Sequence, residues 1–174
     1  MILRFSEAGY LVRDPPHPRA CFYYPKGHFV SRRSSNVCSA TTSFRRRLRI
    51  ANTIWAAASS LVGLRAPEVP EHIEHGAYKC YVFVRPDVLS AGWTRDRIMS
   101  EISDLGVPCY SGGCPEVYLE KAFDGTGYRP EKRLPVAREL GETSLMFLCH
   151  PTLSDDEIDL SRGALETVMR RATA

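Results

Sequence analysis

One long amphipathic helix, predicted over residues 44–62, constrains the fold more than any other feature of the chain. Apolar side chains recur there at intervals of three and four residues, which places them on one face: Phe44, Leu48, Ala51, Ile54, Trp55, Ala58, Leu61 and Val62. Thr42 or Ser43 is expected to cap its start, and Gly63 fits its end. The elements that follow must therefore supply the surface against which this face packs.

The remainder of the chain alternates short strands with helices. Tyr, Val and Phe side chains predict a strand over residues 78–86, which Pro86 ends. A helix is expected over residues 94–105, capped by Thr94 and stopped by Gly106. Its buried stripe is expected to contain Ile98, Ile102 and Leu105.

The same alternation continues to the last helix. The expected segments are a short strand at 107–110, a helical turn at 115–123, a polar loop at 123–133, a helix at 134–142 and a strand at 143–151. Ser154 and Glu157 then form a capping box, and the helix they open buries Ile158, Leu165, Val168 and Met169. We therefore expect an α/β fold of the α+β-like kind: the long helix, then a small mixed or antiparallel sheet of about three strands, with flanking helices on one face.

Residues 1–43 form a separate, irregular and basic segment in this interpretation, ahead of a domain at 44–174. Only a short hairpin at 22–30 stands out in them. Residues 1–50 hold ten Lys or Arg and two Asp or Glu, whereas the rest of the chain is net acidic. The segment is then either a basic arm that contacts an anionic partner, or disordered or misread text, such as GC-rich DNA translated in an unintended frame.

Composition and motif spacing narrow the functional class. No apolar run approaches the roughly 20 residues that span a bilayer, and no secretory signal is recognisable, so a cytoplasmic protein without a membrane partner is expected. The six cysteines include no CxxC pair and are expected to be free thiols. The arginine run at 45–49 lacks interleaved aromatics, so nucleic acid is not an expected partner.

Residues 105–123, LGVPCYSGGCPEVYLEKAF, combine two cysteines, two adjacent glycines and two tyrosines between two helical segments. Cys109 and Cys114 have no second pair at zinc-ligand spacing, and the glycines fit no phosphate-loop pattern. We therefore interpret the stretch as one wall of a pocket, with the cysteines incidental to the chemistry. No catalytic or metal-binding residue is assigned.

Two segments, GVPCYSGGCPEVYLEKAF and LPVARELGETSLMFLCHPTLSDDEI, strongly resemble the C-terminal small-domain part of DegT/StrS-type sugar aminotransferases. The family pattern has a Gly-Ile-x-Thr strand, a His-Tyr-Pro turn, a Leu-His-Leu helix start, a Leu-Ser-Leu-Pro strand, a His-Pro pair and a Thr/Ser-x-x-Glu cap. The matching positions here are Gly106, Val107 and Cys109, then Val117 to Leu119, Ser144 to Leu148, His150-Pro151 and Ser154 to Glu157. The resemblance covers residues 44–174, and 44–62 looks like the helix that joins the family's two domains.

The resemblance implies a substrate-binding wall, with one departure. Gly112, Gly113 and Cys114 replace the His-Tyr-Pro turn whose side chains line the family's sugar pocket, so the backbone is expected to approach the substrate closely there. Tyr118 still offers a hydroxyl. The substrate-binding residues implied are Tyr110, Ser111, Gly112, Gly113 and Tyr118.

The resemblance also implies pyridoxal phosphate as the cofactor of the parent family. That cofactor needs a Schiff-base lysine, an acid on the pyridine nitrogen and a phosphate cup, which the family's large N-terminal domain supplies. The lysines here are Lys26, Lys79, Lys121 and Lys132, and none stands in the family's Schiff-base context. We therefore assign no cofactor-binding residue and expect this chain not to bind pyridoxal phosphate alone.

Three readings of function remain open at this point. In the first, the chain is a fragment of an aminotransferase that acts on keto-sugar nucleotides in polysaccharide or antibiotic-sugar biosynthesis, inactive alone. In the second, it is a stand-alone binding or assembly module that docks on a full-length relative or an anionic partner. In the third, a neighbouring chain supplies the large domain of a split enzyme. Without a large domain, Ile54 and Trp55 are expected to be exposed, so a homo-oligomer or a partner large domain is expected.

Overall fold

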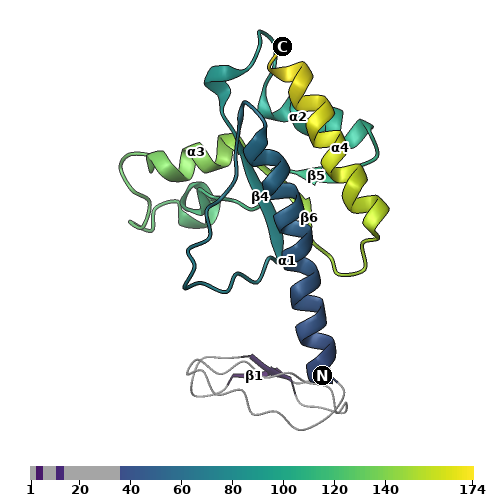
Figure 1. Ribbon diagram of the computed structural model, residues 1–174. Coiled ribbons are helices and arrows are strands. Elements are labelled where there is room, and N and C mark those ends of the chain that lie inside the picture. Colours follow the sequence, from purple (N-terminus) through teal and green to yellow (C-terminus); the bar gives the residue numbers. More distant parts are fainter. Residues whose placement is uncertain (1–2, 6–10, 14–35) are drawn as a thin grey trace. The chain divides into compact units, whose positions relative to one another are not determined.

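The computed structural model describes residues 3–5, 11–13 and 36–174 (Figure 1). The chain divides into two units, Met1–Val37 and Cys38–Ala174. In the first unit, β1 (Leu3–Phe5) and β2 (Leu11–Arg13) pair antiparallel. The hairpin expected at 22–30 lies outside the described residues.

The second unit contains a four-stranded antiparallel sheet in the order β3-β4-β6-β5. Its elements are α1 (Asn36–Ser60), β3 (Leu64–Arg65), β4 (Lys79–Val84), the 3-10 turn η1 (Pro86–Val88), α2 (Arg95–Asp104), β5 (Cys109–Tyr110), the 3-10 turns η2 (Val117–Leu119) and η3 (Lys121–Phe123), α3 (Pro135–Thr143), β6 (Ser144–Leu148) and α4 (Asp155–Ala172). The α/β class is confirmed, and the sheet is antiparallel. Within this sheet the sequence did not predict β3, which is too short to show an alternating pattern, and in the first unit it did not predict β1 or β2.

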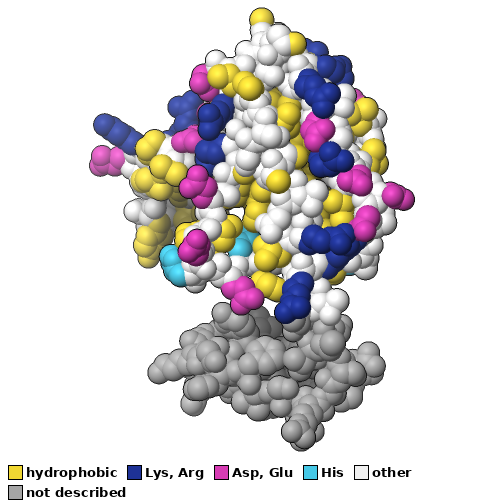
Figure 2. Space-filling view, in the orientation of Figure 1, with side chains coloured by type: hydrophobic (Ala, Val, Ile, Leu, Met, Phe, Trp, Pro, Cys, Tyr) yellow, Lys and Arg dark blue, Asp and Glu magenta, His cyan; other side chains and the backbone are white. Residues whose placement is uncertain are grey.

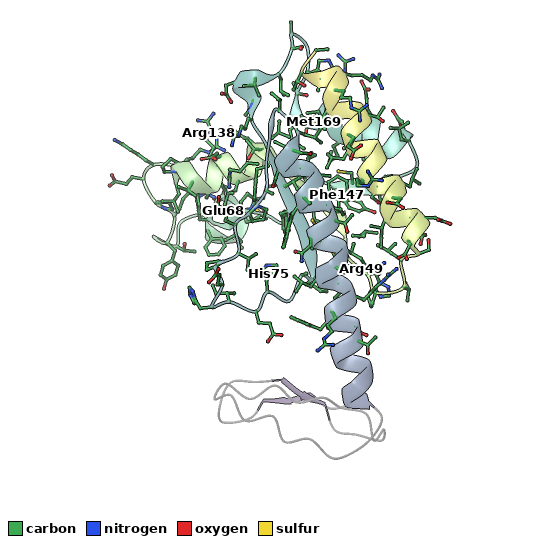
Figure 3. The ribbon with its side chains drawn as sticks, viewed as in Figure 1. Arg49, Glu68, His75, Arg138, Phe147 and Met169 are labelled. Carbon is green, nitrogen blue, oxygen red and sulfur yellow. The ribbon has the colours of Figure 1, made fainter. Side chains whose placement is uncertain are left out.

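The inner face of the sheet holds the core. Cys80 lies opposite Phe147, and Val82 lies opposite Leu145, so these side chains point to the same side of the sheet. All four are at most 1% exposed. Helices α1, α2 and α4 cover this face, and side chains from α1 and α4 complete the core (Figures 1 and 3).

The outer face of the sheet carries α3, which lies on the opposite side of β4 from α4 (Figure 1). The prediction of helices on one face is therefore wrong. Arg65 links β4 to α3. Its guanidinium lies 4.4 Å from the centroid of the Phe83 ring on β4 and 3.6 Å from a carboxylate oxygen of Glu139 on α3. A short helix with apolar residues on one side does not reveal which face of a sheet it covers.

Helix α1 begins at Asn36, well before the predicted start near Phe44. Thr42 and Ser43 therefore lie inside the helix and do not cap it. Gly63, with φ of +86°, follows the helix end as predicted.

Ile54 is 1% exposed and Trp55 is 8% exposed, so the expectation that these side chains are exposed is wrong. The indole Nε1–H of Trp55 donates to the Tyr81 carbonyl at 3.0 Å. That carbonyl lies beyond the two positions at which β3 pairs with β4, so Trp55 satisfies an acceptor that the short strand leaves open. The domain thus buries this part of α1 by itself.

The starts of α2 and α4 match the sequence prediction. Thr94 accepts a hydrogen bond from the Arg97 amide, and Ser154 with Glu157 forms both bonds of the capping box. Leu105, however, is 43% exposed, because the helix has already ended at Asp104. Helix α4 carries acidic side chains in its first turn and arginines in its last, and Glu166 between them pairs with Arg162 and Arg170. Acidic and basic side chains lie close together on this face of the molecule (Figure 2). Among the described residues, no helix is long and apolar enough to cross a membrane.

Candidate functional site

The segment that follows β5 is anchored to the start of β6. Tyr110 pairs with Met146 at the edge of the sheet, and its side chain is 49% exposed. The Ser144 hydroxyl donates to the Ser111 carbonyl at 2.7 Å, while the Arg95 guanidinium donates to the Ser144 carbonyl at 3.0 Å. The buried Ser144 therefore fixes the point at which the chain leaves the sheet.

Gly112 packs directly against the ring of Tyr81 on the outer face of β4. Its φ is +91°, and a Cβ at this position would lie 2.4 Å from Tyr81 Cε1. Both the backbone conformation and the contact exclude a larger side chain. Tyr81, rather than a ligand, thus occupies the space that the missing side chain leaves.

Gly113 differs from its neighbour, because a Cβ there would meet no atom within 4 Å. The next residue, Cys114, is exposed, and its thiol donates to Glu120 Oε1 at 3.4 Å. This bond to a carboxylate raises the pKa of the Cys114 thiol. At the other side of the turn, burial raises the pKa of Cys109 to about 12. Neither thiol is prepared for nucleophilic chemistry, which requires the thiolate.

Three polar side chains hold the loop that follows. Glu116 accepts hydrogen bonds from the Tyr118 hydroxyl at 2.6 Å and from Arg133 Nε at 2.9 Å, and Arg133 makes a second contact to its other oxygen. The bond from Arg133 and then that from Tyr118 lower the pKa of Glu116 to about 2. The Tyr118 hydroxyl also accepts from the Leu134 amide at 2.9 Å. Segments 116–118 and 133–134 are thereby joined across the polar loop.

Two further contacts fix this loop. The Arg129 guanidinium donates to the carbonyls of Tyr118 and Leu119 at 3.0 and 3.1 Å, which caps the end of η2. Pro115 lies against Gly141 of α3, where a Cβ would be only 2.8 Å from the proline Cγ. The loop from residue 111 to residue 134 is therefore seated on α3 and the outer face of the sheet.

The predicted site residues now separate into two groups. Among the described contacts, the hydroxyls of Tyr110 and Ser111 make no hydrogen bond, and both side chains are exposed. The Tyr118 hydroxyl instead serves the loop, as donor to Glu116 and acceptor from Leu134. The edge at 110–113 thus presents two neutral hydroxyls and an open stretch of backbone, which suit hydrogen bonding to a polyhydroxyl ligand.

Sequence reasoning missed the residues that support this edge, which are Tyr81, Ser144, Glu116 and Arg133. Their partners are distant in the sequence, since Ser111 and Ser144 are 33 positions apart. The adjacent glycines were the available signal, but they do not reveal that only Gly112 has a tight neighbour.

The described lysines do not fit a pyridoxal-phosphate site. Lys121 in η3 and Lys132 in the loop before α3 are both exposed. Lys79 borders a hollow of about 160 Å³ that no Asp or Glu lines, so no carboxylate is placed for the pyridine nitrogen. No catalytic step through that cofactor is derived from this part of the chain.

Comparison with known proteins gives structural neighbours, while no protein-family model and no curated protein matches the chain. An aminotransferase from Psychrobacter cryohalolentis is 46% identical, with a TM-score of 0.73 over 80% of this chain and 37% of that one. The aminotransferase TlmJ from Streptoalloteichus hindustanus is 25% identical, with a TM-score of 0.67 over 79% of this chain and 35% of its own.

Neighbours of lower identity support the fold alone. A DegT DnrJ EryC1 StrS aminotransferase from Brucella abortus has 19% identity and a TM-score of 0.59 over 73% of this chain and 31% of its own. A Streptococcus pneumoniae protein described as a sugar aminotransferase, solved in a PLP form, has 19% identity and a TM-score of 0.63 over 78% and 33%. The chain spans about a third of the length of each of these proteins. In fold and in sequence, the chain therefore resembles a part of the DegT/DnrJ/EryC1/StrS-type sugar aminotransferases, as its motifs predicted.

Proposed function

We propose that this chain is the small-domain part of a pyridoxal-phosphate-dependent aminotransferase that acts on keto-sugar nucleotides. The observation that carries the proposal is the 46% identity to the Psychrobacter aminotransferase over 80% of this chain. Since the chain spans 37% of that enzyme, the remaining parts of the site would come from elsewhere. The absence of a fitting lysine among the described residues supports this division of roles.

In this proposal, residues 110–118 form one wall of the substrate pocket. Tyr110 and Ser111 bind sugar hydroxyls through their free hydroxyl groups, and the open backbone at Gly113 lies along the substrate, while Gly112 lets the chain pass over Tyr81. Tyr118 acts indirectly, because its hydroxyl holds Glu116 and Leu134 in place. The cofactor supplies the amino-group chemistry when bound, and this wall orients the sugar.

A domain exchange tests the proposal. Residues 44–174 would replace the matching part of the Psychrobacter aminotransferase, and transamination of a keto-sugar nucleotide would be measured with glutamate as amino donor. We expect the hybrid to bind pyridoxal phosphate and to turn over, whereas residues 1–174 alone show neither Schiff-base absorbance nor turnover. A folded, cofactor-loaded hybrid without activity would refute the proposal, as would turnover by the isolated chain.

The roles within the wall can be separated in the same hybrid. Tyr110→Phe and Ser111→Ala each remove a hydroxyl that binds no other described group, so we expect a higher KM with stability unchanged. Tyr118→Phe removes a bond of the loop, so it lowers stability as well. A KM equal to that of the unmodified hybrid in both Tyr110→Phe and Ser111→Ala would show that this edge does not contact the substrate.

A further inference from the structure

The hollow beside Lys79 is distinct from the proposed substrate wall in the residues that line it. It has a volume of about 160 Å³ and is enclosed by α1, by the residues that begin β4 and by the end of β6 with the turn after it. None of residues 110–118 lines it. The candidate wall leaves the sheet after Tyr110, and Ser111 is anchored there to Ser144, the first residue of β6.

The charges around this hollow are of one sign. Arg47 and Lys79 are the charged residues that line it, and no Asp or Glu does. Neighbouring arginines on α1 differ in this respect, because Arg46 and Arg49 both pair with Asp155. Among the described residues, neither Arg47 nor Lys79 forms an ion pair, so the positive potential of the hollow is not neutralised from within the domain.

Arg47 carries a donor that has no acceptor. Its Nε is buried and makes no hydrogen bond, while its guanidinium lies 5.7 Å from the centroid of the Tyr78 ring. An unsatisfied buried donor is costly, and a guanidinium presents a planar fork that matches a carboxylate or a phosphate. An oxyanion in the hollow would pair with the guanidinium of Arg47, which lines it and has no ion-pair partner among the described residues.

The thiol of Cys149 also lines the hollow. The hydrogen bond from Cys80 chiefly lowers the pKa of this thiol, and the charge of Arg47 lowers it further. The positive charge of Arg47 therefore acts on a group that lines the hollow.

The remaining lining is apolar and aromatic. Tyr78, Met146, Phe147 and Leu148 supply it, and Tyr78 and Leu148 are 74% and 40% exposed. A volume of 160 Å³ corresponds to about five water molecules at roughly 30 Å³ each, which suits a single ring or a short aliphatic group. We propose that this hollow binds a small organic anion, whose charged group lies on Arg47 and whose apolar group lies against Tyr78 and Leu148.

Ligand titration of the 1–174 chain tests this assignment by ¹H–¹⁵N NMR. The probes are benzoate and phenyl phosphate, with benzyl alcohol as the neutral analogue and inorganic phosphate as the anion without an apolar group. We expect shifts at Arg47, Tyr78 and Cys149 with either aromatic anion, saturating at least tenfold earlier than with the other two probes. Higher ionic strength should weaken the binding.

Two variants on the same helix make the test specific. Arg47→Gln should weaken binding of both aromatic anions at least tenfold, and Arg47→Lys should do so less, because it keeps the charge and loses the fork. Arg45→Gln is the matched control, since Arg45 is exposed and forms no described ion pair, and it should leave binding unchanged. Arg47→Lys also covers the case in which Arg47→Gln fails to fold.

The proposal is overturned by any of three results. These are binding of benzyl alcohol or inorganic phosphate as tight as that of the aromatic anions, shifts that cluster away from the hollow, and equal binding by the Arg47 and Arg45 variants. Because none of these measurements depends on transamination, they stand or fall independently of the proposed function.

Discussion

The two faces of the sheet are held by different forces. On the inner face, α1, α2 and α4 bury an apolar core that includes Val82, Leu145 and Leu165, each 0% exposed. On the outer face, the loop between β5 and α3 is held by Glu116, Tyr118 and Arg133. The stability of the inner face thus depends on filled volume and buried apolar area, whereas the outer face depends on directed hydrogen bonds and two close glycine contacts, those of Gly112 and Gly141. The candidate substrate wall belongs to the outer face.

The largest expected effect tests the inner face. Leu165→Ala on α4 removes a fully buried side chain, and we expect it to cost about 2–5 kcal/mol of unfolding free energy. Leu160→Ala on the same helix is the control, because Leu160 is 50% exposed and its replacement should change stability by about 0.5 kcal/mol or less. Urea unfolding measures both. Equal losses would mean that α4 does not bury Leu165 in the core.

The next effect tests the outer face at its closest contact. Gly112→Ala forces an L-residue to φ of +91° and places its Cβ against Tyr81, so we expect a loss of about 1–3 kcal/mol. Gly113→Ala has open space and should stay within about 0.5 kcal/mol. The measurements are urea unfolding and the NMR shifts of the Tyr81 ring. A loss that is the same for both glycines would contradict the Tyr81 contact.

This difference between the faces explains which parts of the fold the sequence could predict. Strand β4, helices α2 and α4, and their buried residues follow from apolar periodicity, which the inner face imposes. The start of α1 could not be predicted in this way. Thr42 and Ser43 are residue types that commonly cap helices, but α1 continues through them. The burial of Ile54 and Trp55 was missed because a resemblance to larger proteins suggested a missing partner, whereas Tyr81 and the core already supply one.

The candidate wall was predictable only in its location. Motif order predicted a short strand followed by the segment up to Tyr118, and the structure has β5 at Cys109–Tyr110, whereas the role of this segment as a substrate wall stays a prediction. The supporting contacts, such as Ser111 with Ser144, join residues that no local period relates. From the sequence, both adjacent glycines were expected to let the backbone approach a substrate. In the structure, Gly112 is constrained by Tyr81 and Gly113 is not.

A smaller effect is expected for a polar contact on the inner side, the N-cap of α4. Since apolar burial dominates this face, the cap should contribute less to stability than the buried side chain of Leu165. Ser154→Ala removes the N-cap of α4, and we expect a loss of about 1 kcal/mol. Ser161→Ala is the control, because Ser161 lies inside α4 and bonds the Glu157 carbonyl, so stability should change by about 0.5 kcal/mol or less. Thermal unfolding of the two variants measures the difference. A loss from Ser154→Ala as large as that from Leu165→Ala would break the distinction between the two faces.

The last effect separates the faces by pH. Arg133, and then Tyr118, hold the pKa of Glu116 at about 2, below its ordinary value near 4.5. A lowered carboxyl pKa stabilises the fold above the unfolded-state value, and this contribution is lost as pH falls from about 4.5 to 2. Glu116→Gln removes that contribution, so the variant should be less stable than the wild type at pH 6 and should converge with it near pH 2.

Asp155 and Glu157 also have lowered pKa values, Asp155 chiefly through its bond from Arg46 and Glu157 through the Ser154 amide, so total stability falls with acid in both proteins. The informative quantity is therefore the difference in unfolding free energy between the wild type and Glu116→Gln at each pH. Asp155→Asn is the control on the inner side of the sheet. The NMR signal of the Leu134 amide, which donates to Tyr118, reports the outer loop directly. The chemical shift of this amide should change with acid in the wild type and in Asp155→Asn but not in Glu116→Gln. If the Leu134 signal is unaffected by acid in all three proteins, the outer loop is held by packing, and the contrast between the faces is lost.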